Sequence, residues 1–437
     1  MNTLPVDTIP EPVRFLLKKL ELAHHRAFVV GGAVRDVCLG RPVTDWDLAT
    51  SASVRSIQSI FGDTPRYTLG HATVAVIVGD RTCEITPFKG QTNTLEEDLS
   101  LRDLTINAMA LDSEARQIID RHNGCRDLRD KVIRAVENPG NRFREDPLRL
   151  LRAVRFAAQL GFKIHKDTAS AISANAPLLS NAAPERIREE LMKILMVRKP
   201  SGYFNILATT GLLKAFLPEL LEGRLKRQNQ YHRYTIFKHI LETMDHVKPD
   251  PLLRVTALFH DIAKPRIRTK LEGTWRFHGH EKASALLAEE IMKRLKFSNK
   301  MIRESTHLIK NHLIGYNSEW SDAAVRRLIK RVGPDFIEDL MTFRKADILA
   351  HGKKNNHQEI LLQLDNRIQE QLASSPPLHV SNLAIDGNAV MMLTGLSPGP
   401  AVGKMLAELA EKVIEDPRLN QPERLEIMLK EMKDAQR

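Results

Sequence analysis

Apolar and polar positions divide the chain into a mixed first part and a helical remainder. The apolar run Ala27–Val30 precedes two glycines and a helical segment. Val74–Val78 and Arg81–Thr86 are typical of strands, and the Gly79-Asp80 pair between them is typical of a hairpin turn. From about residue 141 onward, apolar residues recur mainly at helical spacing. The pattern predicts an α+β fold, with a small mixed sheet in the head and a long, all-helical body.

Two polar stretches indicate further divisions of the chain. EGRLKRQNQYH at 222–232 is polar and basic, and ASSPP at 373–377 interrupts the helical pattern with two serines and two prolines. We therefore expect a head, a helical neck, a histidine-bearing helical domain and a helical tail. Their expected ranges are 1–137, 138–222, 223–372 and 373–437.

Composition narrows the class of protein. The 437 residues include 65 Lys and Arg against 54 Asp and Glu, and the resulting net charge of +11 favours a polyanionic partner. An apolar content of 42% supports packed cores rather than a disordered chain. No apolar run is long enough for a membrane span, and the first residues lack the layout of a signal peptide. Three cysteines are too few for a disulfide framework, so we expect a reduced, cytoplasmic protein.

Two aspartates in the head have the spacing of a metal site. Asp45 and Asp47 stand two apart in VTDWDL, and a strand would project both from one face. Glu84, on the strand after the Gly79-Asp80 turn, can add a third carboxylate. Carboxylates held side by side repel each other unless a cation lies between them, and oxygen ligands suit Mg²⁺ or Mn²⁺. The sequence therefore predicts that either ion binds in the head.

A glycine turn near these acids is suited to a phosphate. Gly31-Gly32 opens a helix, and Arg35 lies within its first turn. Backbone N–H groups at a helix start and an arginine both bind phosphate. Alone, a paired glycine or an Asp-x-Asp is usually an ordinary turn. Together they indicate metal-assisted nucleotidyl transfer.

Three motifs resemble those of class II tRNA nucleotidyltransferases and bacterial poly(A) polymerases: GGAVRD at 31–36, TDWDLAT at 44–50 and RDLTINAMA at 102–110. The resemblance implies a DNA polymerase β-like head with Asp45, Asp47 and Glu84 as catalytic acids. It also implies nucleotide binding by Gly31, Gly32, Arg35, Arg102, Asp103 and Asn107. Without the resemblance, Asn107 would be interpreted as a helix cap or a buried, hydrogen-bonded amide.

REDPLRLLRAVRF at 144–156 predicts a helix with Asp146 as its N-cap and Pro147 at its first position. Its Glu-Asp-x-x-Arg pattern resembles the family's amino-acid template. Asp146 can accept from the amine that cytosine and adenine share, while Arg149 donates to the neighbouring ring nitrogen. Uracil and guanine present an oxygen to Asp146 instead, so the pair would select C and A. The alternative is a solvated basic helix face.

The resemblance extends the nucleotide-binding set to Arg152 and Arg155, although strict three-residue spacing turns Arg155 away from the common face. PERIREEL at 184–191 looks like the family's next motif. We expect this helix to be a scaffold in which Glu185 and Arg186 pair with each other.

A second set of residues in the body can bind metal. TALFHDIAKP at 256–265 resembles an HD phosphohydrolase signature, and RKADILAHG at 344–352 adds a further aspartate. Mixed nitrogen and oxygen ligands suit Mn, Ni, Fe, Co or Zn better than Mg. An active domain would hydrolyse phosphomonoesters or 2′,3′-cyclic phosphates, whereas an inactive one would be a scaffold. The expected ligands are His239, His260, Asp261 and Asp347, with His278, His280 and His312 as further candidates.

The chain departs from the family pattern at two places. Residues 88–98 leave almost no room for the flexible loop that full CCA-adding members carry and that is associated with switching from C to A. Leu101 stands where relatives usually have arginine. The resemblance therefore favours an enzyme that adds two cytidines from CTP to tRNA 3′ ends, with a separate A-adding enzyme in the same cell. Complete CCA addition, which also uses ATP, and A-only addition are the alternatives.

Other classes of function stay open at this point. They are a poly(A) polymerase, a phosphohydrolase whose head only binds RNA, and a non-catalytic tRNA-binding protein. GLSPGPAVG at 395–403 also resembles the family's C-terminal region. We expect this tail to contact tRNA, with Lys404 near a phosphate.

Overall fold

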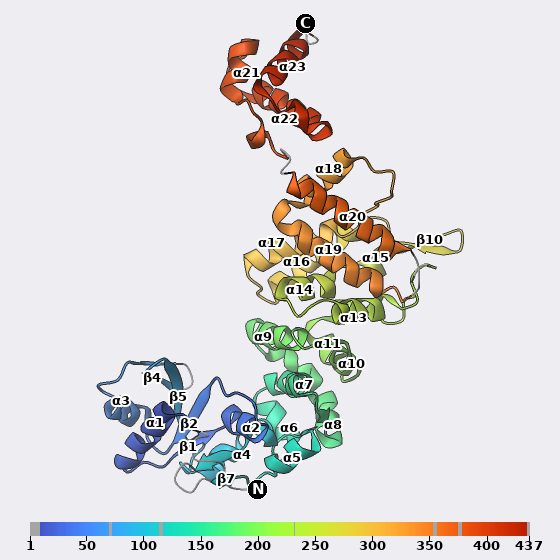
Figure 1. The fold of residues 1–437 in the computed structure, drawn as a ribbon. Coiled ribbons are helices and arrows are strands. Elements are labelled where there is room, and N and C mark those ends of the chain that lie inside the picture. The colour runs from blue at the N-terminus through green and yellow to red at the C-terminus, as the bar shows by residue number, and fades with distance from the viewer. Residues whose placement is uncertain are drawn as a thin grey trace. The chain divides into compact units, whose positions relative to one another are not determined.

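The computed structural model describes residues 9–69, 72–112, 117–230, 232–352, 356–374 and 378–434. It contains two compact units, Met1–Pro218 and Glu219–Arg437 (Figure 1). Residue 231 of the first predicted boundary stretch and residues 375–377 of the second lie outside the described residues. Residues 1–8 also lie outside them. The division of the chain into four domains stays a prediction.

A seven-stranded mixed sheet forms the head of the first unit, in the order β3-β4-β5-β2-β1-β6-β7. Within this sheet, the β2–β5 pair is parallel and the other described pairs are antiparallel. The predicted mixed sheet and the hairpin around Gly79 are both confirmed. The strands are β1 (Ala27–Val30), β2 (Trp46–Thr50), β3 (Arg66–Thr68), β4 (Val74–Val78), β5 (Arg81–Pro87), β6 (Ala110–Asp112) and β7 (Gln117–Ile119).

Helices cover the sheet, as the blue part of Figure 1 shows. On one face, Leu95 and Leu99 of α4 pack against Phe28, Val30 and Ala49 of the central strands. Burial of this apolar surface stabilises the sheet and holds β1 and β2 rigid. The helices of the head are α1 (Glu11–Leu22), α2 (Gly32–Cys38), α3 (Val54–Ile60), α4 (Leu95–Ser100) and the 3₁₀ turn η2 (Thr105–Asn107).

The rest of the first unit is mainly helical. One short strand pair, β8 (Val132–Ile133) with β9 (Lys163–Ile164), interrupts the helices. The helical elements are α5 (Gly124–Asp130), α6 (Pro139–Glu145), α7 (Leu148–Leu160), α8 (Lys166–Asn175), η3 (Ala176–Asn181), α9 (Pro184–Leu195), α10 (Ser201–Thr209) and α11 (Leu212–Phe216), with α12 (Pro218–Leu221) at the junction.

Helix α7 begins one residue later than the sequence predicted. Pro147 is its N-cap rather than its first helical residue, and Pro147 already has helical dihedral angles. The Asp146 side chain nevertheless accepts a hydrogen bond from the backbone N–H of Leu148 at 3.1 Å. Asp146 therefore satisfies one N–H group of the first turn while it projects beyond the helix.

The second unit is helical, as predicted, apart from one hairpin. Glu272 and Gly273 connect its two strands with φ values of 47° and 78°, which suit a tight hairpin turn. Its elements are α13 (Ile236–His246), α14 (Pro251–Phe259), α15 (Lys264–Ile267), β10 (Thr269–Leu271), β11 (Thr274–Arg276), α16 (His280–Arg294), α17 (Asn299–Asn311), α18 (Asp322–Val332), α19 (Pro334–Leu349), α20 (His357–Ala373), η4 (Val380–Asn382), α21 (Gly387–Thr394), α22 (Pro400–Glu415), η5 (Pro417–Leu419) and α23 (Pro422–Asp434).

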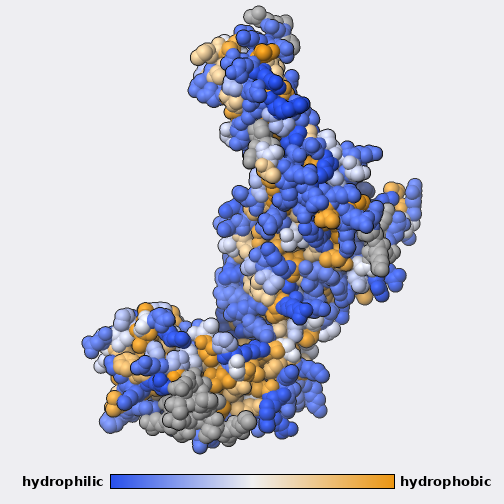
Figure 2. Space-filling model, viewed as in Figure 1, coloured by the Kyte–Doolittle hydropathy of each residue, from blue (hydrophilic) through white to orange (hydrophobic). Residues whose placement is uncertain are grey.

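The last three helices of this unit have an apolar core of their own, which includes Val390, Leu409 and Leu425. Arg326 of α18 joins them to the preceding helices, because its guanidinium donates to the carbonyl of Ile414 at 2.7 Å. Hydrophilic residues predominate on the visible face (Figure 2). Within the described ranges, no helix combines the length and the apolar content that crossing a membrane requires.

Candidate active site

A cleft of about 630 Å³ in the first unit brings together the residues that the sequence predicted for the head and the template. Its walls come from the start of α2, from β2 and β5, from the η2 region and from α7. The predicted residues that line it are Gly31, Gly32, Arg35, Asp45, Asp47, Glu84, Arg102, Asp103, Asn107, Asp146, Arg149, Arg152 and Arg155.

The acids meet because β2 and β5 run parallel in register. Asp47 is the direct neighbour of Glu84, Asp45 precedes β2 by one residue, and Trp46 between the aspartates is buried. Burial, together with the negative charges of Glu84 and Asp45, raises the pKa of Asp47 to about 6. A cation would relieve this repulsion. The oxygen-only donors thus fit Mg²⁺ or Mn²⁺.

The glycine turn leaves room for the Arg102 guanidinium. Gly31 has a φ of 72°, and a Cβ atom there would lie 2.9 Å from the Arg102 guanidinium. A side chain at this position would be strained and would displace Arg102. Arg102 is held from the other side by Asp98, to which it donates at 2.9 and 3.1 Å.

A continuous polar network connects α2, η2 and α7. The Arg35 guanidinium donates to Asn107 Oδ1 at 2.8 Å, the Asn107 amide donates to Asp103 Oδ1 at 3.2 Å, and Arg152 contacts Asp103 Oδ2 at 2.6 Å. Burial alone would raise the pKa of Asp103, but Arg152, Asn107 and the Leu104 N–H group together hold it below its usual value. Asn107 is therefore a buried amide with both of its polar groups bonded.

The two predicted template residues, Arg149 and Asp146, have separate partners. Arg149 pairs with Glu145 at 3.1 Å and donates to the Leu101 carbonyl at 3.0 Å. Asp146 pairs with Arg186 of α9 at 3.0 Å. The predicted pairing of Arg186 with Glu185 is wrong, because the packing of α9 against α7 brings the Arg186 guanidinium to Asp146 instead.

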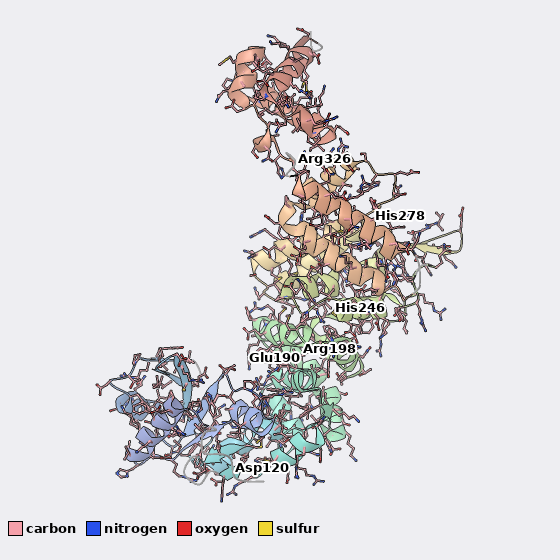
Figure 3. All side chains as sticks on the ribbon, in the orientation of Figure 1. Asp120, Glu190, Arg198, His246, His278 and Arg326 are labelled. Atoms are coloured by element: carbon pink, nitrogen blue, oxygen red, sulfur yellow. The ribbon has the colours of Figure 1, made fainter. Side chains whose placement is uncertain are left out.

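Arg155 has a buried partner that sequence reasoning missed. Its guanidinium contacts Glu190 of α9 at 2.6 Å and lies 3.7 Å from the Phe156 ring centroid. The sequence feature that could have indicated this partner is the position of Glu190 on the apolar face of α9, between Ile187 and Ile194. Figure 3 labels Glu190 on this helix.

Other cleft residues were also missed, namely Asp36, Lys89, Phe156 and Lys193. Lys193 follows Arg186 by seven residues, or two helical turns, so a basic stripe along α9 was the signal. The ring of Phe156 has three guanidinium groups, those of Arg35, Arg152 and Arg155, within 5.5 Å of its centroid.

In the second unit, the four predicted histidine and aspartate ligands meet. His239 Nε2 lies 3.0 Å from Asp347 Oδ1, and His260 Nε2 lies 3.3 Å from Asp261 Oδ2. All four side chains are buried. Of the further candidates, His280 and His312 also reach this cluster, whereas His278 is exposed between β11 and α16 (Figure 3).

The nitrogen-rich donors fit a transition metal better than Mg²⁺. His239 Nε2 also faces His260 Nε2 at 3.2 Å, a contact that a shared cation would stabilise. Two cationic side chains offset the negative charge of the two carboxylates: Lys264 contacts Asp261 at 2.6 Å, and Arg344 contacts Asp347.

Comparisons with known proteins agree with the motifs of the head. The family model of the poly(A) polymerase head domain matches residues 27–134, that of the RNA- and SrmB-binding site of polymerase A matches 161–223, and that of tRNA nucleotidyltransferase domain 2 matches 278–429.

Similar proteins cover most of the chain. An A-adding tRNA nucleotidyltransferase of Deinococcus radiodurans is 33% identical over 88% of this chain and 91% of its own. A CC-adding tRNA nucleotidyltransferase of Thermus thermophilus is 33% identical over 88% of this chain and 89% of its own. The crystal structure of the Bacillus stearothermophilus CCA-adding enzyme in complex with CTP superimposes with a TM-score of 0.74 at 28% identity, covering 98% of this chain and 99% of that one. The chain therefore belongs to the tRNA nucleotidyltransferase and poly(A) polymerase family, and it has the fold of a CCA-adding enzyme.

Proposed function

We propose that this protein adds cytidylate from CTP to the 3′ end of tRNA without a nucleic-acid template. The observation that carries the proposal is the single cleft in which acids, glycine turn and template residues converge. A cleft of about 630 Å³ has room for one nucleotide and an RNA terminus.

The cleft residues have separate roles in the proposed nucleotidyl transfer. The 3′-hydroxyl of tRNA gives up its proton to solvent and its oxygen forms a bond to the α-phosphorus of CTP, while the α–β P–O bond breaks and pyrophosphate leaves. Arg35 and Arg102, with the N–H groups after Gly31, bind and orient the triphosphate. Asp45, Asp47 and Glu84 would hold Mg²⁺, which supplies activation of the hydroxyl and neutralisation of the phosphates when bound.

Asp146 and Arg149 would read the incoming base. Arg186 holds the carboxylate of Asp146, and Glu145 holds the guanidinium of Arg149, so both groups are oriented before the nucleotide enters. This preorganisation reduces the entropy lost on binding. Each base-edge contact of this kind discriminates by about 1–3 kcal/mol.

Addition of CC rather than CCA is supported by the segment at 88–98. The Glu97 carboxylate accepts from the backbone N–H groups of Gln91 and Thr92 at 2.9 and 2.6 Å, and Asp98 accepts from that of Lys89 at 3.1 Å. These bonds close a short turn where family members that add CCA have a flexible loop. Complete CCA addition, with ATP as second substrate, is the alternative.

The test uses three tRNA transcripts that end at the discriminator base, at C and at CC. Each is incubated with Mg²⁺ and with CTP, ATP or both, and the products are resolved to one nucleotide. We expect growth to stop at CC. A finished CCA end would overturn the CC-only proposal, A added only to the CC-ended transcript would indicate A-only addition, and long tails with ATP alone would indicate a poly(A) polymerase.

Metal-dependent phosphohydrolysis in the second unit is a second candidate function, which the buried cluster of histidines and aspartates favours. A pocket beside it is basic and contains Arg227, Arg233 and Tyr234, with His232 in contact with the His239 ring. Phosphomonoesters and 2′,3′-cyclic nucleotides are the substrates to test with Mn²⁺, Co²⁺ or Ni²⁺. Hydrolysis that persists in an Asp347→Asn variant would contradict this candidate.

A further inference from the structure

A two-stranded hairpin, β10–β11, projects from the helices of the second unit (Figure 1). Its strands are antiparallel, with Thr269 opposite Arg276 and Lys270 opposite Trp275. Residues 268–276 are all described, and none of them is buried. A ribbon of two short strands without an apolar core adds little to the stability of a fold. The surface of this hairpin is therefore accessible to a partner.

The alternation of side chains gives the hairpin two different faces. Residues two apart in a strand, and residues directly opposite each other in adjacent strands, lie on the same side. Arg268, Lys270 and Trp275 thus share one face, whereas Leu271 and Arg276 lie on the other. Arg268 Cζ lies 4.2 Å and Lys270 Nζ 5.9 Å from the centroid of the Trp275 ring. The indole is therefore in contact with two cations of its own face.

The hairpin carries positive charge that no acid offsets. Within the described ranges, no carboxylate forms an ion pair with the three cations of residues 268–276. Arg266, just before the hairpin, is by contrast paired with Glu222 at 2.7 Å. The one acid in the segment is Glu272, which lies at the turn. Three cations against one acid leave the hairpin positive, which suits a polyanionic partner.

The indole narrows the class of polyanion. Trp275 is partly exposed, so part of its ring surface is accessible. Unpaired bases stack on aromatic rings while their phosphates bind neighbouring lysines and arginines. The bases of a duplex are already stacked on each other and do not reach such a ring. An acidic protein or lipid surface would use the cations but would offer no flat ring to the indole. The face therefore fits single-stranded RNA best.

We propose that the β10–β11 hairpin binds single-stranded RNA, with a base stacked on Trp275 and phosphates bound by Arg268 and Lys270. The proposal goes beyond nucleotide addition, because the hairpin belongs to the second unit and the residues that line the cleft all belong to the first. Binding at the hairpin requires neither metal nor nucleoside triphosphate. Its failure and the failure of nucleotide addition are therefore separate results.

The experiment follows the tryptophan fluorescence of the full chain as a single-stranded RNA of about eight nucleotides is added without metal or nucleoside triphosphate. A base stacked on an indole quenches its emission. Because the chain has three tryptophans, substitutions identify the one that reports binding. We expect quenching in the wild type, loss of quenching in Trp275→Phe and full quenching in Trp320→Phe. No quenching in the wild type, or quenching that persists in Trp275→Phe, would overturn the proposal.

Substitution of a cation tests the phosphate contacts while Trp275 still reports binding. Lys270→Ala should reduce the slope of log affinity against log salt concentration by about 0.7, the value for one phosphate of a single strand. Leu271→Ala is the matched control, because Leu271 is 57% exposed on the other face of the hairpin, and it should keep both the quenching and the slope.

An unchanged slope in Lys270→Ala would contradict the phosphate contact. Equal quenching by heparin, which has no bases, would show that the hairpin binds polyanions in general. Equal quenching by an RNA duplex of the same sequence would show that unpaired bases are not what the hairpin recognises.

Discussion

At the residue scale, we expect selection of the base to depend on how the Asp146 carboxylate is held. Asp146 contacts Arg186 at 3.0 Å, and Arg186 is half-exposed at the cleft. We expect Arg186→Ala to lower the preference for CTP over UTP by about 2- to 13-fold, because a mobile carboxylate gives up roughly half of a 1–3 kcal/mol base contact. Single-nucleotide incorporation with each triphosphate measures the ratio of kcat/KM values.

Arg186→Lys should recover part of the selectivity, because a lysine can still contact one carboxylate oxygen. Glu185→Ala is the control on the same helix and should leave the ratio unchanged. Equal loss of CTP and UTP incorporation in Arg186→Ala would show instead that Arg186 binds the phosphates.

The charge of Asp103 gives a prediction about stability and pH. Its carboxylate bonds Arg152, Asn107 and a backbone N–H group, which keep its pKa below the usual value in the folded protein despite burial. Such a group stabilises the fold above its unfolded pKa of about 3.9, and the contribution is lost as the pH falls through the lower folded value.

We therefore expect Asp103→Asn to lower the free energy of unfolding by about 1–3 kcal/mol at pH 7. The difference from the wild type should shrink below about pH 4, where the carboxyl begins to be protonated in the unfolded wild-type chain but not yet in the folded protein. Denaturant unfolding across this pH range measures both proteins. A difference that is constant down to pH 2 would show that shape rather than charge matters at this position.

The sequence identified single cleft residues better than it identified their partners. Asp45, Asp47 and Asp146 could be predicted because spacing and local chemistry mark them. The Asp146–Arg186 contact joins residues 40 positions apart. It depends on how α7 packs against α9, which no local pattern specifies, and so the sequence wrongly favoured the neighbouring Glu185.

At the scale of elements, a buried ion pair fastens α7 to α9. The side chains of Arg155 and Glu190 are 9% and 5% exposed, and the two groups lie 2.6 Å apart. We expect Glu190→Ala to destabilise the protein by about 3–5 kcal/mol, because it leaves a buried guanidinium without its counter-charge. Thermal unfolding monitored by circular dichroism measures the loss.

Glu189→Ala is the matched control, since Glu189 is 59% exposed on the same helix and should cost well under 1 kcal/mol. Replacing both Arg155 and Glu190 by apolar residues should restore part of the lost stability. If the Glu190→Ala and Glu189→Ala variants unfold at the same temperature, the Arg155–Glu190 ion pair does not stabilise the packing of α7 against α9.

Elements were predicted where the sequence carries a strong local signal. The hairpin at Gly79 has such a signal, whereas β10–β11 was missed because its turn, Glu272-Gly273, lies within a polar segment without apolar alternation. The parallel pairing of β2 with β5 puts Glu84 beside Asp47. That pairing is a property of the whole sheet, which the alternation within a single strand does not specify.

At the scale of the molecule, the two candidate sites share no residue. The acids of the head lie within Met1–Pro218, and the histidine cluster lies within Glu219–Arg437. Each site is built from groups of its own unit, and the two sets of donors favour different ions, since oxygen ligands suit Mg²⁺ and imidazoles suit transition metals. A substitution in one site should therefore leave the activity or metal binding of the other site unchanged.

We expect Asp47→Asn to abolish nucleotide addition and to leave the Co²⁺ content of the protein unchanged, because the carboxylate that it removes belongs to the head alone. His239→Ala should do the reverse, lowering bound Co²⁺ while nucleotide addition to a tRNA lacking its CCA end stays within about twofold of the wild type. Primer extension and metal analysis on the same preparations measure both quantities, and a thermal melt confirms that each variant is folded. A folded His239→Ala protein that has lost nucleotide addition would contradict this independence, because a metal site in one unit would then control chemistry in the other.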